Sequence, residues 1–320
     1  MFGTEAGDAA ITFADAGKQF DGSWVVEHLD LEVPRGRIFG LIGPSGCGKT
    51  TTVRLANGVY RPDAGEVSMF GQASSSMRAR DRAVIGYLPQ QPALFDHLSL
   101  RENLNFHASL NGVRFRRRQR LAEVLELVEL GEHAGKLVSE SSGGMRRRLA
   151  LAATLVHRPD VVLLDEPTAG IDPILRRRFW DHFRSLADAG HTFVVTTQYV
   201  GEAADCDEVG LLAEGRLVAN GSPDALRRQA VGGELLEVET DRPVDGAMSG
   251  ELAEAVAAGS FEYVGPQCLR FVVDDAGAAL PVMLQQLERR GIGTRHAAEV
   301  VPDYDDVFIK LVGSAREAAQ

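Results

Sequence analysis

The chain has 320 residues, of which 34 are Lys or Arg and 45 are Asp or Glu, so its formal net charge is -11. This length suits one large domain and a smaller one. The acidic balance argues against a general nucleic-acid-binding protein.

The predicted elements begin with two strands, residues 11–20 and 24–33, joined by the turn-forming "DGS". Apolar and polar residues alternate in the second strand, so one of its faces should meet water. An apolar strand at 37–43 leads through a glycine-rich loop into a helix at 51–59, and "GEVSMFGQ", residues 65–72, is a further short strand. This order of strand, glycine-rich loop and helix is the context that a phosphate-binding loop requires.

Residues 91–158 are predicted to be mainly helical. Leu121, Val124 and Leu125 recur at helical spacing, and Gly131 is a helix stop. Farther along, "SESSGGMRRRLALA" places Ser and Gly directly before another helix with periodic apolar residues. Because the first turn of a helix presents free N–H groups and a partial positive charge, this segment is a candidate anion site.

Strands and helices alternate in the next part of the chain. The apolar strand "VVLLDE", residues 161–166, suits a parallel strand covered on both faces. A helix is predicted around 174–190, a strand at 191–198, and a hairpin at 208–221 that turns at Glu214-Gly215. This alternation predicts an α/β fold.

The composition changes near Ala230, because residues 231–320 carry 16 acidic but only 7 basic side chains. The expected order in this part is a strand at 234–240, a helix at 250–258, two strands, a helix at 276–290, a strand and a final helix. Such a β-α-β-β-α-β order is compatible with a small ferredoxin-like α+β domain. The predicted boundaries are therefore 9–230 for the main domain and 231–320 for an accessory domain.

Three features bear on the compartment. No apolar run approaches the ~20 residues of a membrane-spanning helix. The first ten residues lack the basic and apolar regions of a secretory signal, and three widely spaced cysteines fit a reducing environment. We therefore expect the chain to work in the cytoplasm.

The glycine-rich loop "GPSGCGKT", residues 43–50, matches the pattern G-x-x-x-x-G-K-[ST]. Backbone N–H groups of such a loop surround the β-phosphate, Lys49 reaches the β and γ oxygens, and the Thr50 hydroxyl can ligate Mg²⁺. We interpret Cys47, inside the loop, as a small filler whose thiol takes no part in the chemistry. The expected nucleotide-binding residues of this segment are Gly43, Pro44, Ser45, Gly46, Cys47, Gly48, Lys49, Thr50 and Thr51.

Phosphoryl transfer also needs a carboxylate that holds the metal and a group that orients or deprotonates the attacking water. The strand "VVLLDEPT" supplies two adjacent carboxylates at its end. Asp165 is the predicted Mg²⁺ residue, and Glu166 is the candidate general base.

Together with this loop, "SSGGM" at 141–145 and "LLDEPTAGID" at 163–172 make the chain resemble the ATPase subunit of an ABC transporter. The resemblance covers residues 11 to about 225. It implies a P-loop NTPase (RecA-like) core with an antiparallel β subdomain, and a helical subdomain at about 91–158. It also implies that the cofactors are ATP and Mg²⁺.

The resemblance assigns Ser142, Gly143 and Gly144 to the signature motif, with Ser141 where leucine is commoner and Met145 where glutamine is often found. In this family the signature helix of one subunit points at the γ-phosphate of ATP held by the other subunit. It therefore implies that two nucleotides are sandwiched between two copies of the chain. The anion expected at the candidate anion site in "SESSGGMRRRLALA" is then the γ-phosphate of ATP held by the other copy.

Further positions follow from the same resemblance. Gln90 in "YLPQ" matches the Q-loop, expected at the metal and the γ-phosphate, and "AGID", ending at Asp172, resembles the D-loop. Phe20 stands where an aromatic ring stacks on adenine, although a core position is the other interpretation of this residue. Gln198 replaces the usual histidine; its amide can donate a hydrogen bond to phosphate but cannot carry a proton near neutral pH.

The implied function is ATP hydrolysis, with catalytic Lys49, Glu166 and Gln198, that drives transport through a separate membrane permease. "TTQY" and the terminal "PDYDDVFIKLVG" are similar to segments of ATPases that serve ABC-2 type exporters. This favours export and a location at the inner face of the membrane. Alternatives are a non-transport ABC ATPase and a weakly hydrolysing nucleotide-gated regulator, and the accessory domain is either regulatory, dimer-supporting or merely structural.

Three arginine clusters stand out at 116–118, 146–148 and 176–178. Solvated helix surface is the simpler interpretation of each cluster. Contact with a membrane subunit or with anionic headgroups is the alternative, most of all for the first cluster, whereas nucleic acid is disfavoured by the overall charge.

Overall fold

The computed structural model describes residues 9–78 and 80–318. The chain divides after Asn220 into two compact units. This break lies ten residues before the boundary drawn from composition, which stays a prediction. Among the described residues, no helix has both the length and the apolar character that a bilayer-spanning segment needs.

The first unit contains an antiparallel sheet of order β2-β1-β4-β5. Its strands are β1 (Ala9–Phe20), β2 (Ser23–Pro34), β4 (Ala64–Met69) and β5 (Gln72–Ala73). Phe13 of β1 pairs with Leu31 on one side and Val67 on the other, and all three side chains are buried. The alternation seen in the sequence thus turns one face of this sheet into a core.

A second sheet of the first unit has the order β10-β9-β3-β8-β7-β6, in which β3 runs parallel to β8 and β9, and β7 runs parallel to β6 and β8. Its strands are β3 (Ile38–Ile42), β6 (Ile85–Leu88), β7 (Val161–Asp165), β8 (Thr192–Thr197), β9 (Glu208–Ala213) and β10 (Arg216–Gly221). Every residue of β3, β7 and β8 is buried, as expected for parallel strands covered on both faces. The predicted α/β fold is confirmed.

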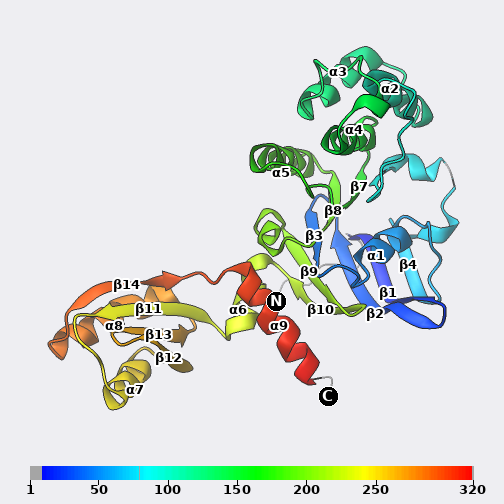
Figure 1. Cartoon of the computed structure of the whole chain (residues 1–320). Helices are drawn as coiled ribbons and strands as arrows, with labels where there is room; N and C mark the ends of the chain where they lie inside the picture. The colour runs from blue at the N-terminus through cyan, green and yellow to red at the C-terminus, as the bar shows by residue number, and fades with distance from the viewer. Residues whose placement is uncertain (1–8, 79, 319–320) are drawn as a thin grey trace. The chain divides into compact units, whose positions relative to one another are not determined.

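The helices of the first unit fall into two groups. Helix α1 (Lys49–Ala56) follows the glycine-rich loop and α5 (Pro173–Asp188) precedes β8. Helices α2 (Leu100–Leu110), α3 (Arg117–Leu127) and α4 (Gly143–Leu155) contact one another and gather at one end of the unit, away from the antiparallel sheet (Figure 1). Short 3₁₀ turns are η1 (Ser74–Ser76), η2 (Asp81–Val84), η3 (Val138–Glu140) and η4 (Val200–Asp205).

The second unit has an antiparallel sheet of order β12-β13-β11-β14. Its strands are β11 (Glu234–Thr240), β12 (Ser260–Gly265), β13 (Cys268–Val273) and β14 (Thr294–Val300). Helices α7 (Gly246–Ala255) and α8 (Ala276–Arg289) contribute to a core around Phe271 and Met283. The β-α-β-β-α-β order with β11 and β13 in the centre is the ferredoxin-like arrangement.

Two details of this unit depart from the sequence prediction. Helix α7 begins at Gly246 instead of residue 250, because the Asp245 carboxylate accepts a hydrogen bond from Met248 N at 2.8 Å and caps the helix there. Helix α6 (Pro223–Val231), which composition placed in the main domain, packs against α9 (Tyr304–Ala318). The Arg227 guanidinium lies 3.8 Å from the centroid of the Tyr304 ring.

Candidate functional site

The parallel strands bring four predicted segments to one edge of the six-stranded sheet. The phosphate loop follows β3, Glu166 follows β7, and Gln198 follows β8 directly. Gln90 comes two residues after β6. Because parallel strands end at the same edge, residues more than a hundred positions apart meet where α/β proteins bind their ligands.

The phosphate loop is closely fitted to its surroundings. A Cβ at position 43 would lie 2.1 Å from the Leu212 carbonyl oxygen, and Gly48 has a φ of 109°, so both positions require glycine. Lys49 is 5% exposed, and its Nζ donates to the carbonyl oxygens of Gly43 at 2.7 Å and Pro44 at 2.9 Å. These bonds use two of the three N–H donors of the ammonium group, which leaves one for an anion.

Cys47 is buried within the same loop. Burial raises the pKa of its thiol, and the positive charge of Lys49 opposes this shift. The Cys47 carbonyl oxygen accepts a hydrogen bond from Gly215 N at 3.1 Å, which ties the loop to the turn between β9 and β10. A protonated, enclosed thiol is consistent with the predicted role of a filler.

Asp165 is 1% exposed at the end of β7. Its Oδ1 accepts hydrogen bonds from Thr196 Oγ1 at 2.7 Å and from Thr50 Oγ1 at 3.2 Å. Its Oδ2 is buried, and no donor among residues 9–78 and 80–318 reaches it. A buried carboxylate oxygen without a donor is costly unless a cation or its water satisfies it, so Asp165 and Thr50 fit the hard oxygen ligands that Mg²⁺ prefers.

Glu166 has a left-handed backbone conformation, with a φ of 53°. Its N–H donates to the hydroxyl oxygen of Thr196 at 3.0 Å and to the Thr196 carbonyl at 3.1 Å. The guanidinium Nη2 of Arg147, on α4, donates to the Glu166 carbonyl oxygen. Burial lowers the pKa of Arg147, and the nearby charges of Glu166 and Asp165 oppose this shift.

Thr196 and Arg147 are the two residues of this site that the sequence analysis missed. Thr196 was assigned no role beyond its place in a strand and in the "TTQY" segment, and Arg147 was assigned only to an arginine cluster. A residue one strand away that hydrogen-bonds a predicted metal carboxylate leaves no signal in the sequence, because the pairing of β7 with β8 creates the contact.

The signature segment forms a capped helix start. Ser142 Oγ accepts a hydrogen bond from Met145 N at 3.2 Å, whereas the buried Ser141 donates to the Leu137 carbonyl at 2.9 Å. Gly143 and Gly144, the first helical residues, are exposed. Within the described part of the chain, none of the three signature residues bonds to the phosphate loop, and Figure 1 shows α4 apart from α1.

Two further predicted residues lie at the surface. Phe20, at the end of β1, is 39% exposed, and its ring meets the Tyr60 ring edge-to-face at a centroid distance of 5.3 Å. Gln198 is exposed directly after β8. Their assigned contacts, with adenine and with the γ-phosphate, stay predictions, as do the metal and nucleotide contacts of Gln90.

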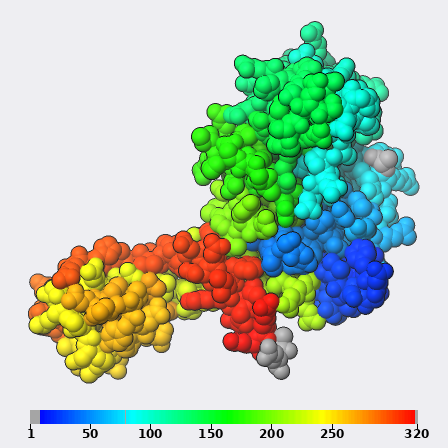
Figure 2. All heavy atoms as spheres, viewed as in Figure 1, coloured from blue at the N-terminus to red at the C-terminus, as the bar shows by residue number. Residues whose placement is uncertain are grey.

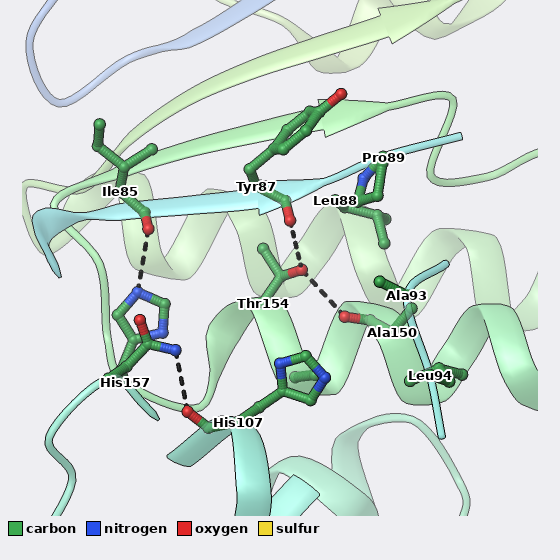
Figure 3. Close-up of a pocket in the computed structure, with 12 residues that line it drawn as sticks. Ile85, Tyr87, Leu88, Pro89, Ala93, Leu94, His107, Ala150, Thr154 and His157 are labelled. Atoms are coloured by element: carbon green, nitrogen blue, oxygen red, sulfur yellow. Dashed lines mark hydrogen bonds between the residues drawn. The ribbon is translucent and has the colours of Figure 1, made fainter. Parts of the chain in front are cut away.

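A cavity of about 180 Å³ lies between β6 and the helical group (Figure 3). Thr154 Oγ1, on α4, donates to the Tyr87 carbonyl at 3.4 Å, and His157 Nε2 bonds the Ile85 carbonyl at 3.2 Å. His107 of α2 points into the same space. These contacts fasten the strand that leads to Gln90 to the end of α4.

The chain is similar in sequence and fold to known proteins. The family model described as "ABC transporter" matches residues 26–169. The daunorubicin resistance ATP-binding protein DrrA3 of Streptomyces coeruleorubidus is 37% identical over 319 residues, 98% of this chain and 99% of the relative. The Nod factor export ATP-binding protein I of Paraburkholderia xenovorans (strain LB400) is 36% identical over 308 residues, 96% and 98% of the two chains. A solved structure of an ATP-binding subunit of an ABC transporter superposes with a TM-score of 0.65 at 26% identity, covering 69% of this chain and 92% of the other.

Proposed function

The chain belongs to the ABC transporter family as an ATP-binding subunit, and from this membership we propose that it hydrolyses MgATP to drive export through a separate membrane permease. The observation that carries the proposal is the sheet edge at which Lys49, Asp165 and Glu166 meet. These residues supply a phosphate-binding ammonium group, a metal-holding carboxylate and a second carboxylate next to it.

Each residue of the edge has a distinct task in the proposed reaction. Lys49 and the loop N–H groups would hold the β- and γ-phosphates, and Asp165 with Thr50 would hold Mg²⁺, whose positive charge would stabilise the negative charge of the phosphate oxygens. Glu166 accepts a proton from the water whose oxygen attacks the γ-phosphorus, while the bond from that phosphorus to the ADP oxygen breaks. Gln198 donates a hydrogen bond to a γ-phosphate oxygen.

The signature segment supports a site shared between two copies. The N–H groups of Gly143 and Gly144 start α4 on an exposed surface, and among the described residues the hollow beside them is lined by Arg146 and Arg147 but by no lysine. We propose that they bind the γ-phosphate on the phosphate loop of a second copy. Hydrolysis then removes the group that joins the two chains, so the dimer opens.

The proposal of export through a permease is supported by the relatives and by the C-terminal segment of the chain. One relative is named for daunorubicin resistance and another for Nod factor export. The "PDYDDVFIKLVG" segment, which lies largely in α9, resembles ATPases that serve ABC-2 type permeases. We propose a permease of this type, attachment to the inner face of the membrane through it, and a supporting role for residues 231–320 in regulation or dimerisation.

Hydrolysis is tested by phosphate release from purified wild-type protein and from Glu166→Gln, which keeps the shape of the side chain but removes the base. The wild type should release phosphate in proportion to enzyme, and Glu166→Gln should lose at least about 100-fold of kcat. Gel filtration in saturating MgATP should show the variant as a dimer. A wild type without turnover would favour the alternative of a nucleotide-gated regulator, which only Gln198 supports.

The shared site has a sharper test in mixed variants. Lys49→Ala and Ser142→Arg chains should each be inactive alone, yet a mixture should recover about a quarter of wild-type turnover, because half of the dimers then hold one intact composite site. The matched control mixes wild type with the double variant, and every mixed dimer then carries one lesion at each site. Because wild-type homodimers alone would give about a quarter of the turnover in this mixture, the mixed dimers of both experiments are isolated through two different affinity tags before the assay. Equal activity of these mixed dimers in the two experiments contradicts the shared site.

A further inference from the structure

The three arginine clusters, alike in sequence, differ in what their side chains contact. In the cluster 146–148, Arg146 and Arg148 donate to the carbonyls of Val138 and Val128 at 3.1 and 3.0 Å, and Arg147 donates to Glu166. Each member of the cluster 176–178 forms an ion pair. Internal contacts therefore account for two of the three clusters.

The remaining cluster belongs to an exposed basic loop, residues 114–118, which follows α2 and runs into the first turn of α3. Only Arg117 of this loop is used internally, through a bond from its Nε to the Val113 carbonyl at 2.8 Å. Arg114, Arg116 and Arg118 are exposed, and none of them forms a hydrogen bond or ion pair through its guanidinium with any described residue. The nearest acidic side chain in the sequence, Glu123, is engaged by Arg120 and Arg158 at 3.3 and 3.5 Å.

An aromatic ring stands in the middle of the basic loop. Phe115 is 83% exposed, the largest exposure of any large apolar side chain among the described residues. The Arg116 guanidinium lies 5.4 Å from the centroid of this ring. A hollow of about 340 Å³ beside them is lined by Phe115 and Arg116 and also by Arg120, Arg158 and the Glu123 carboxylate that pairs with both of these arginines, so the unpaired positive charge comes from the loop itself.

This loop belongs to the helical group, which is drawn at the top of the view in Figure 2. The positive charge is local, because the chain as a whole carries a net charge of -11. Unpaired guanidinium groups suit phosphate oxygens, and an exposed aromatic ring beside them suits the boundary between headgroups and acyl chains. A nucleic acid would need a basic surface longer than one loop.

We propose that the basic loop, residues 114–118, docks on anionic phospholipid headgroups, with Phe115 inserted at the headgroup boundary. The three unpaired arginines contact lipid phosphates directly. The loop thus gives the chain a membrane contact of its own, in addition to any contact with a permease, and this contact needs neither ATP nor hydrolysis.

The test measures co-sedimentation of the full chain with vesicles of phosphatidylcholine alone or with 30% phosphatidylglycerol. Binding should need the anionic lipid and should disappear in 1 M NaCl, where the screening length falls to about 3 Å. Replacement of Arg114, Arg116 and Arg118 by Gln should weaken binding about 100-fold, since each basic residue near an anionic surface contributes about a factor of five. Phe115→Ser should weaken it about tenfold.

The matched control is a triple variant with the same change in charge at three exposed arginines elsewhere, Arg61→Gln, Arg78→Gln and Arg289→Gln, which should bind like the wild type. Equal losses in both triple variants would show a general charge effect and overturn the proposal. Absence of wild-type binding to anionic vesicles would do the same. Equally tight binding of a duplex DNA fragment through the loop would also overturn the proposal, because the loop would then not be specific for lipid headgroups.

Discussion

Thr196 offers a strict test of how the sheet edge positions the metal-holding carboxylate. Its buried hydroxyl donates to Asp165 Oδ1 at 2.7 Å, while the other donor to this oxygen, Thr50, lies at 3.2 Å. Thr196→Val removes the shorter bond at nearly constant volume, together with the bond that the same hydroxyl accepts from Glu166 N, whose second bond, to the Thr196 carbonyl, remains. A hydrogen bond to a charged group contributes about 1.5–3 kcal/mol, which corresponds to a factor of about 10 to 150.

We expect the free Mg²⁺ concentration for half-maximal ATP hydrolysis to rise about 10- to 100-fold in Thr196→Val, the usual loss when a carboxylate that holds a metal loses its orienting partner. The assay is phosphate release at fixed saturating ATP over a Mg²⁺ titration. Thr197→Val is the control, because this neighbouring hydroxyl is also buried but accepts from Tyr199 N at 3.0 Å instead of touching Asp165. Equal Mg²⁺ requirements of the two variants refute the reasoning.

Three other predictions concern the surroundings of this edge. Arg147→Met should lower kcat about tenfold with KM for ATP unchanged, and Arg147→Lys should recover part of the loss, since it keeps a charged donor for the Glu166 carbonyl. Arg118→Met is the control at an exposed position. Equal kcat in all three variants would contradict the role of this contact. Gln198→His should preserve or raise the rate of phosphate release, and complete inactivation would show that the amide is required. Burial lowers the pKa of His107 and His157, so below about pH 6.5 the unfolded chain binds protons more readily than the folded chain. The melting temperature should therefore fall from pH 7.5 to 5.5, and it should fall less in His157→Gln. A melting temperature independent of pH would contradict this role of the two histidines.

Periodicity and turn chemistry were sufficient to predict most elements. The strand at 234–240 coincides with β11, and the hairpin at Glu214-Gly215 is present, because local patterns decide such features. The start of α7 was placed four residues late. Two of its first five residues, Gly246 and Gly250, are glycines, which are weak helix formers, and the cap at Asp245 outweighs them.

Side-chain partners were less predictable than elements. The arginine clusters look equivalent in sequence, but Arg148 reaches Val128 and Arg178 pairs with Glu129, both far away along the chain. Those contacts exist only once the helices have packed, so periodicity cannot separate an engaged arginine from a free one. The phosphate loop was predictable for the opposite reason, because its function depends on backbone conformation encoded in consecutive residues.

Helix α4 connects the signature segment to the candidate general base, Glu166. Its start presents Gly143 and Gly144 outward, while Arg147, one turn later, reaches inward to the Glu166 carbonyl. If the proposed contact with a phosphate on a second copy displaces α4, we expect the displacement to reach the backbone of the candidate general base through this bond. Because Glu166 has a left-handed backbone conformation, we expect a change in this hydrogen bond to alter the direction of its carboxylate. We therefore expect hydrolysis to depend on contact between copies even when each phosphate loop is fully occupied by ATP.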